Sequence, residues 1–249
     1  MCFGSFIKGV TMTIALIIAG GVGNRMGQDI PKQFLNVYDK PVIIYTLEAF
    51  QSHPNIDAIE VVCLEGWHEI LRAYCRQFGI TKLEGIVSGG NSAQESIRNG
   101  VDEIAKNHAG DDIVIIHDAV RPLVDISILS DVISTTSKFG NGVSSMPYNE
   151  QIFVKADEAT STKYIPRETL QRVVTPQGYR LEKLKWAYDK AFREGIGTGS
   201  SSYTNTMMVE LGETLHFASG SEKNIKLTTK ENLEIFKAYL NMDKSGWIK

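Results

Sequence analysis

The stretch TIALIIAGGVGNRMG, residues 13–27, decides the fold. Residues 13–19 are almost continuously apolar and rich in isoleucine, which is typical of a strand buried on both faces of a parallel sheet. Further short runs of this kind lie at residues 58–64, 83–87, 113–117 and 143–146. The sequence therefore predicts a largely parallel sheet whose first strand ends in a glycine-rich turn.

Helical patterns separate these runs. Apolar residues recur at helical spacing over residues 41–50, 67–78 and 126–139, the last behind Asp125 as candidate cap. Another helix begins behind Ser92, and Glu95 completes a candidate capping box there. Strands that alternate with helices predict an α/β protein with three layers, a mostly parallel central sheet and right-handed crossovers, in a Rossmann-like arrangement.

The alternation of strands and helices stops at residues 147–172, which are polar and lack an apolar helical face. We interpret about residues 146–172 as a protruding arm. After it we expect a helix over 181–194, a short helix, strands near 214–217 and 224–228, and a final helix over 230–240. We therefore predict one domain over residues 13–240, with an N-terminal extension over 1–12 and a C-terminal tail over 241–249.

Composition excludes several classes of protein. The 249 residues carry 26 Lys and Arg against 29 Asp and Glu, a net charge of −3 without a basic block, which argues against a nucleic-acid partner. No apolar run approaches the roughly 18 residues that a membrane helix needs, so no membrane partner is expected. The three cysteines, Cys2, Cys63 and Cys75, have neither disulfide-framework nor zinc-site spacing. We expect a cytoplasmic protein.

The glycine-rich turn at residues 19–27 is the first candidate site. In an open parallel sheet, ligands bind outside the carboxyl ends of the strands. Glycines let backbone N–H groups approach an anion closely, and Arg25 and Lys32 add cationic donors, which together suggest a polyphosphate cradle. A dinucleotide-binding motif would need glycine where Met26 stands, and no P-loop pattern exists in the chain. A glycine turn that merely connects two elements is the plain alternative.

Two further segments follow predicted strands. Residues 88–92 open a helix with Gly89 and Gly90, which suits an anion or the polar edge of a base, or else a simple strand-to-helix turn. Asp118 ends the fourth predicted strand, where a carboxylate opposite a phosphate cradle could hold Mg²⁺. Asp118 could instead cap the next turn with Arg121 as its surface partner. His117 is expected in the core, and we assign it no role.

Taken together, these segments resemble the cytidylyltransferases that make CDP-polyols from CTP. That family includes the 2-C-methyl-D-erythritol 4-phosphate enzyme of isoprenoid synthesis and the ribitol-5-phosphate enzyme of wall or capsule synthesis. The resemblance covers residues 13–240 in the family's order. The matching segments are AGGVGNRMG (19–27), PKQF (31–34), GG (89–90), HDAVRP (117–122), TPQ (175–177) and NIK (224–226).

The resemblance implies roles for individual residues. The triphosphate of CTP would lie on the backbone of the glycine turn and on two cations, at Ala19, Gly20, Gly21, Gly23, Arg25 and Lys32. Gly89, Gly90 and Ser96 would recognise cytidine, and Asp118 would bind Mg²⁺. The substrate phosphate would meet Arg167, Thr175 and Lys226, with Arg167 reaching the partner's site across a homodimer held by the arm. Arg25, Lys32, Arg167 and Lys226 would be the catalytic cations.

The chain also departs from the family pattern on the acceptor side. Tyr203-Thr204-Asn205 stands where the family usually has Thr-Asp, Lys223 replaces an acidic residue, and Gln151 replaces an arm threonine. Gly20 and the sequence DAVRP at residues 118–122 resemble the ribitol-phosphate branch of the family more closely. We therefore predict transfer of CMP from CTP to a polyol phosphate, D-ribitol 5-phosphate in the first place. The methylerythritol phosphate enzyme is the alternative, and a non-catalytic CTP-binding homologue or a nicotinamide-dependent dehydrogenase are remote ones.

Overall fold

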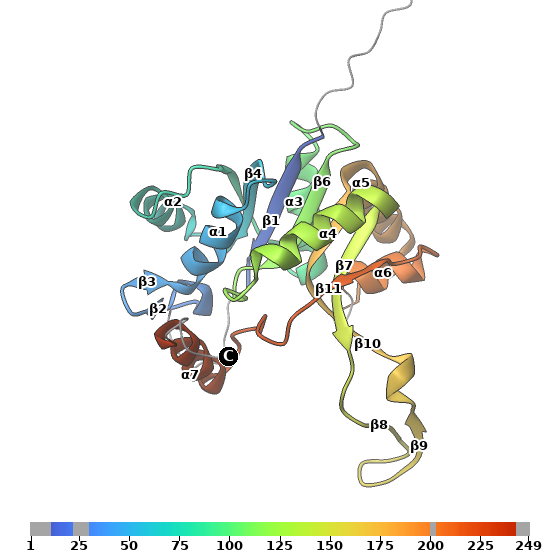
Figure 1. The fold of residues 1–249 in the computed structure, drawn as a ribbon. Coiled ribbons are helices and arrows are strands. Elements are labelled where there is room, and N and C mark those ends of the chain that lie inside the picture. The colour runs from blue at the N-terminus through green and yellow to red at the C-terminus, as the bar shows by residue number, and fades with distance from the viewer. Residues whose placement is uncertain (1–10, 22–29, 200–202, 243–249) are drawn as a thin grey trace, which may run out of the picture.

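A computed structural model of the protein describes residues 11–21, 30–199 and 203–242. Its centre is a seven-stranded sheet in the order β11-β7-β10-β6-β1-β4-β5 (Figure 1). Only β10 runs antiparallel to its neighbours. The strands are, in sheet order, Phe217–Ser219, Asn141–Pro147, Gln171–Arg180, Ile113–Asp118, Thr13–Ala19, Ala58–Cys63 and Leu83–Ser88. The predicted, mostly parallel sheet is thus confirmed.

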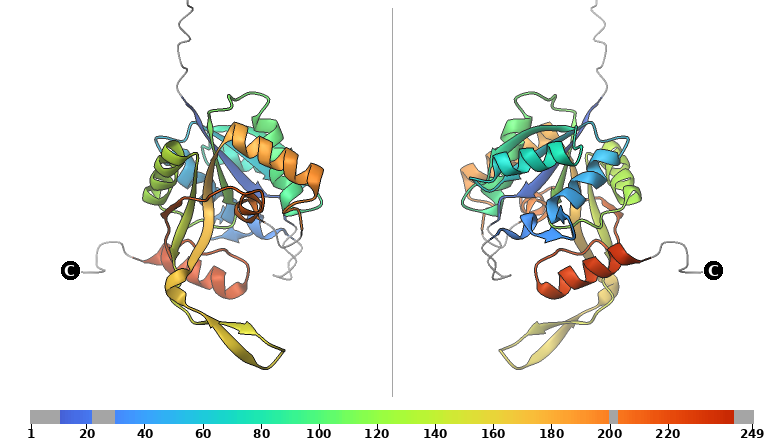
Figure 2. Two further views of the ribbon diagram at one scale, coloured as in Figure 1. Left: turned by 90° about the vertical axis from the view of Figure 1, so that its right-hand side faces the viewer. Right: turned by 90° about the vertical axis from the view of Figure 1, so that its left-hand side faces the viewer.

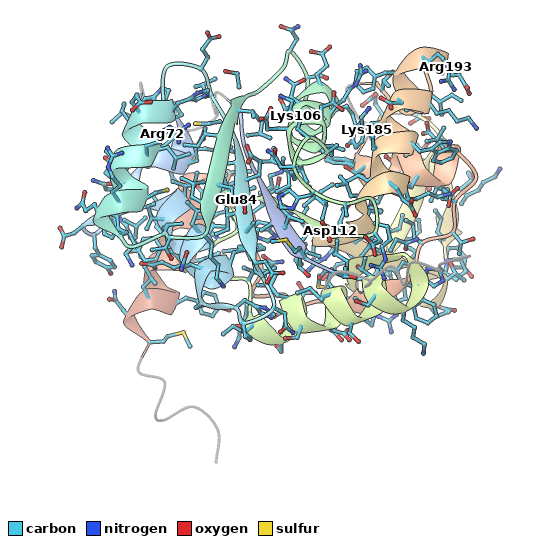
Figure 3. All side chains as sticks on the ribbon, turned by 90° about the horizontal axis from the view of Figure 1, so that it is seen from above. Arg72, Glu84, Lys106, Asp112, Lys185 and Arg193 are labelled. Carbon is cyan, nitrogen blue, oxygen red and sulfur yellow. The ribbon has the colours of Figure 1, made fainter. Side chains whose placement is uncertain are left out.

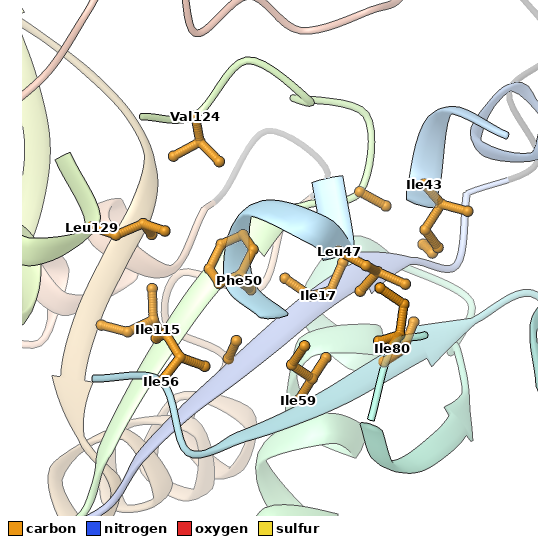
Figure 4. Close-up of a cluster of buried hydrophobic side chains, with 14 of the residues drawn as sticks. Ile17, Ile43, Leu47, Phe50, Ile56, Ile59, Ile80, Ile115, Val124 and Leu129 are labelled. Atoms are coloured by element: carbon orange, nitrogen blue, oxygen red, sulfur yellow. The ribbon is translucent and has the colours of Figure 1, made fainter. Parts of the chain in front are cut away.

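Helices cover both faces of this sheet. Because strand side chains alternate, Ile17 and Ile115 face α1 (Val42–Ser52), α2 (His68–Gln77) and α4 (Ile126–Phe139). Figure 4 shows Ile17 and Ile115 packed with Phe50 of α1 and Leu129 of α4. The opposite face packs against α3 (Ala93–Ile104), α5 (Leu181–Glu194) and α6 (Thr204–Glu210). These two apolar layers hold the sheet between the helices, and the parallel strands all end at the same edge of the sheet.

The arm is a hairpin of β8 (Ile152–Lys155) and β9 (Ser161–Ile165), followed by the 3-10 helix η3 (Arg167–Thr169). Figure 2 shows it projecting beyond the body of the molecule. Its apolar side chains Phe153 and Tyr164 are 59% and 69% exposed. A smaller hairpin, β2 (Asn36–Val37) and β3 (Lys40–Pro41), follows the 3-10 helix η2 (Lys32–Phe34), and α7 (Lys230–Asn241) packs near it.

Several local expectations are wrong. Residues 224–228 form no strand, because the Leu227 N–H donates to the carbonyl of Val120, which lies beyond the end of β6, at 2.8 Å rather than to a strand of the sheet. The strand predicted at 214–217 lies instead at Phe217–Ser219. Asp125 makes no capping bond. Ser92 does cap α3, but Glu95 accepts from the N–H of Asn91 rather than that of Ser92.

Among the described helices, none combines the length and apolar character needed to cross a bilayer.

Candidate active site

The predicted segments meet at the carboxyl edge of the sheet. The ends of β1 and β6 and the loop after β5 border a cavity of about 370 Å³ there. From the residues predicted to bind CTP or phosphate, the structure brings the following into its lining: Ala19, Gly20, Gly21, Lys32, Gly90, Ser96, Asp118 and Lys226. Gly23 and Arg25 lie outside the described residues.

The turn after β1 is held by Gln33, a residue that the sequence did not single out. Its side chain is buried, and its amide nitrogen donates to the carbonyls of Ala19 at 2.7 Å and Gly21 at 3.0 Å. Both bonds use carbonyl groups, so Gln33 does not occupy the N–H groups of Gly20 and Gly21. Gln33 follows Lys32 directly, so one short 3-10 helix anchors the glycine turn and carries the lysine.

The second glycine segment packs directly against the first. A Cβ on Gly89 would lie 3.3 Å from Cα of Gly20 and 3.1 Å from Oγ of Ser96, so the approach leaves little room for a side chain. The hydroxyl of Ser96 accepts from the N–H of Gly90 at 3.0 Å and donates to the Ser92 carbonyl at 2.8 Å. Ser96 therefore holds the loop that precedes α3 in place. No local sequence pattern indicates this role of Ser96.

Asp118 lies between two cations. Its Oδ2 accepts from Arg121 at 2.8 Å and its Oδ1 from Lys226 at 3.0 Å. Burial alone would raise the pKa of Asp118, but the charges of Lys226 and Arg121 more than offset burial and lower it to about 2. The carboxylate is therefore ionised at any physiological pH. Arg121 is the expected partner of Asp118, although it is largely buried rather than on the surface.

Lys226 reaches Asp118 because the irregular segment 224–227 crosses the carboxyl end of β6. The amide of Asn224 donates to the Thr175 carbonyl at 2.7 Å, and Arg121 donates to the Asn224 carbonyl at 2.7 Å. Thr175 in turn approaches Asp118, whose N–H donates to its hydroxyl at 3.3 Å. These links bring the predicted residues Thr175 and Lys226 to one carboxylate.

A second cavity, of about 360 Å³, adjoins the first and shares Asp118 and Lys226 with it. Arg121 and Thr175 line it, together with the segment that departs from the family pattern. Thr204 and Asn205 are part of that segment, so the departure lies in this cavity and not in the first one. The pair of cavities can hold two anionic groups on either side of Lys226.

Arg167 and His117 both lie outside the lining of the first cavity. Arg167 lies in the exposed arm, donates to the Asn149 carbonyl at 3.1 Å and lines neither of the two cavities. His117 is in the core as expected, and burial lowers its pKa to about 4. Its Nε2 lies 3.1 Å from the Arg121 carbonyl, and its Nδ1 has no partner among the residues that the structure describes.

The fold and the paired cavities define a nucleotidyltransferase-type α/β protein. The family model of 2-C-methyl-D-erythritol 4-phosphate cytidylyltransferase matches residues 13–242. The chain belongs to this cytidylyltransferase family, whose members are enzymes, and the resemblance seen in the sequence is confirmed.

Individual relatives agree with this assignment. A ribitol-5-phosphate cytidylyltransferase of Lacticaseibacillus paracasei is 56% identical over 92% of this chain and 98% of its own length. A 2-C-methyl-D-erythritol 4-phosphate cytidylyltransferase of Geotalea uraniireducens is 36% identical over 91% of this chain and 95% of its own. The crystal structure of a 4-diphosphocytidyl-2C-methyl-D-erythritol synthase from Anaerococcus prevotii superposes with a TM-score of 0.79 at 20% identity, covering 93% of this chain and 97% of that one. That last likeness confirms the fold.

Proposed function

We propose that the protein transfers CMP from CTP to D-ribitol 5-phosphate, giving CDP-ribitol and pyrophosphate. The observation that carries the proposal is the pair of cavities joined at Asp118 and Lys226, with glycine loops on one side and Thr175 on the other. The choice of ribitol rests on the 56% identity to the L. paracasei relative, against 36% for the G. uraniireducens enzyme.

In this reaction a phosphate oxygen of the polyol phosphate attacks the α-phosphorus of CTP in line. The bond from the α-phosphorus to the bridging oxygen breaks, and pyrophosphate leaves with that electron pair. No covalent enzyme intermediate is needed, so positioning and charge supply the catalysis. Lys226 borders both cavities and is placed to contact both phosphates. Lys32, Gly20 and Gly21 line the first cavity, which would hold the triphosphate and is called the nucleotide cavity, while the second is called the acceptor cavity.

The donor set around Asp118 fits Mg²⁺ in one particular mode. Mg²⁺ is often held by one or two carboxylates while substrate phosphates and water complete its shell. Asp118 is ionised and borders the nucleotide cavity, so it can serve as that carboxylate once Lys226 yields Oδ1. Among the described residues no cluster of three or more His, Cys, Asp or Glu side chains could hold a metal alone. Bound Mg²⁺ would partly neutralise the negative charge on the phosphate oxygens.

We further propose a cytoplasmic homodimer in which the arm delivers Arg167 to the partner's site. The support is the resemblance, together with the absence of Arg167 from the lining of both cavities of its own chain and the exposed Phe153 and Tyr164 on the hairpin. Sedimentation equilibrium of the protein and of Tyr164→Ser tests the dimer, which the variant is expected to weaken. A monomeric wild-type protein that still turns over would contradict this arrangement.

The function is tested by pyrophosphate release from CTP with ribitol 5-phosphate, methylerythritol 4-phosphate, glucitol phosphate and xylulose phosphate in parallel. We expect kcat/KM to be highest for ribitol 5-phosphate. A preference for methylerythritol 4-phosphate would assign the isoprenoid activity instead. A protein that binds CTP but releases no pyrophosphate with any acceptor would be a non-catalytic homologue.

A further inference from the structure

A buried chain of hydrogen bonds joins the walls of the two cavities. The hydroxyl of Tyr188 lies 3.0 Å from Oε1 of Gln94 and 2.8 Å from the hydroxyl of Thr204. The amide nitrogen of Gln94 donates to the Gly197 carbonyl at 2.9 Å. Gln94, Tyr188 and Thr204 are 1%, 0% and 2% exposed, so water does not substitute for any of these bonds.

The ends of this chain lie where the substrates would meet. Gln94 is in the first turn of α3, and its neighbours Ala93 and Ser96 line the nucleotide cavity. Thr204 is the first residue of α6 and lines the acceptor cavity. Tyr188 projects from α5 between them and is the only described side chain bonded to both Gln94 and Thr204. The bond network therefore fixes the start of α6 relative to the start of α3.

The direction of the protons follows from the chemistry of each group. The Gln94 nitrogen must donate to the Gly197 carbonyl, so Oε1 faces Tyr188 and can only accept. The single Tyr188 proton is therefore donated to Gln94, and the hydroxyl of Thr204 must donate to the Tyr188 oxygen. With its proton committed, Thr204 offers only lone pairs to any group in the acceptor cavity.

From this geometry we propose that Tyr188 is a positioning residue for acceptor recognition, an inference that rests on the proposed function. It holds the Thr204 hydroxyl as an obligate acceptor, which suits a hydroxyl of a polyol. Removing the Tyr188 hydroxyl leaves Thr204 free to rotate and to point its proton into the cavity. A substrate hydroxyl then loses a defined partner, while the nucleotide side, held by the cap of Ser92, keeps its shape.

The test compares Tyr188→Phe with the wild-type enzyme in pyrophosphate release and in CTP binding by calorimetry. We expect the KM for the acceptor to rise about tenfold, while kcat at saturating acceptor and the Kd of CTP change less than twofold. The matched control is Tyr45→Phe, whose hydroxyl donates to the Val37 carbonyl at 2.8 Å and lines neither cavity. This control should leave the acceptor KM unchanged.

A double-mutant cycle separates positioning from general loosening. If Tyr188 acts through Thr204, Tyr188→Phe should add nothing to the acceptor KM of Thr204→Val, because the hydroxyl it orients is already gone. Additive effects, or an unchanged KM in Tyr188→Phe, would overturn the inference. Should Tyr188→Phe fail to fold, Gln94→Leu removes the group that takes the Tyr188 proton and is expected to raise the same KM.

The acceptor in these assays is the polyol phosphate that the wild-type enzyme uses best. Turnover with an acceptor other than ribitol 5-phosphate would overturn the choice of substrate and leave this test intact. Absence of turnover with every acceptor would overturn both.

Discussion

Glu60 is a buried carboxyl whose raised pKa predicts a pH-dependent stability of the protein. It lies in the middle of β4, is 5% exposed, and its Oε1 has no hydrogen-bond partner within the described part of the chain. Gly85 faces it on β5, where a Cβ would lie 2.4 Å from Oε2. Burial, assisted by the negative charges of Glu103 and Glu84, raises the pKa of Glu60 from 4.5 to about 7.

The sign and size of the effect follow from linkage. A carboxyl whose pKa is raised in the folded state binds its proton more tightly when folded, so stability falls as pH rises from 4.5 to about 7. The shift corresponds to about 3 kcal/mol of unfolding free energy, at about 1.4 kcal/mol per pH unit. Figure 3 labels Glu84, Lys106 and Arg72, whose charges act on Glu60.

The perturbation is Glu60→Gln, which keeps the shape of the protonated side chain. Urea unfolding of the variant and the wild-type protein should give similar free energies near pH 4.5. At pH 8 the variant should be more stable by up to about 3 kcal/mol. Glu69→Gln is the control, because that side chain is 85% exposed and its loss should not alter the pH dependence. A stability difference between wild type and Glu60→Gln that is the same at both pH values would refute the reasoning.

Three further outcomes are expected at the active site. Lys32→Ala should lower turnover about 10²–10³-fold, with thermal unfolding unchanged, and near-normal pyrophosphate release would remove Lys32 from the catalytic set. Asp118→Asn should abolish turnover and lower stability at pH 7 by about 2 kcal/mol in urea unfolding, because the charge held by Lys226 is lost; a fully stable, active variant would contradict both roles. In Gly90→Ala the new Cβ would lie 2.4 Å from Cβ of Glu95, so the loop must shift and the Kd of CTP should rise at least tenfold; unchanged affinity in calorimetry would mean that this loop does not bind the nucleotide.

The sequence predicts the central parallel strands β1, β4 and β6 well because each is buried on both faces and therefore almost continuously apolar. The same criterion misses β10, whose first residues Gln171 and Arg172 are exposed where the strand leaves the arm. It also assigns a strand to residues 224–228, where the apolar Ile225 and Leu227 pack toward α7 rather than into the sheet. The sequence therefore correctly predicts that Ile225 and Leu227 pack against other apolar residues, but it does not predict that these residues belong to α7 rather than to the sheet.

The site shows the same division between local and distant information. Glycine turns and a carboxylate at a strand end are local patterns, so Gly20, Gly90 and Asp118 could be selected from the sequence. Gln33 and Asn224 could not be assigned roles, because each acts through a carbonyl 12 or more positions away, at Gly21 and Thr175 among others. No pattern in the sequence encodes which distant carbonyl a buried amide will reach.

Electrostatics explains why Asp118 belongs at the junction of the two cavities. Arg121 and Lys226 are held on the two oxygens of Asp118, so without a carboxylate these cations would repel each other at the floor of the site. Asp118 keeps both in place before any substrate is bound, and the trio still has a net positive charge. In the proposed reaction, two phosphate groups that enter from the two cavities would take over the neutralisation of Lys226, which lines both. Little side-chain reorganisation is left for the reaction itself, which is the condition under which fixed charges lower a barrier most.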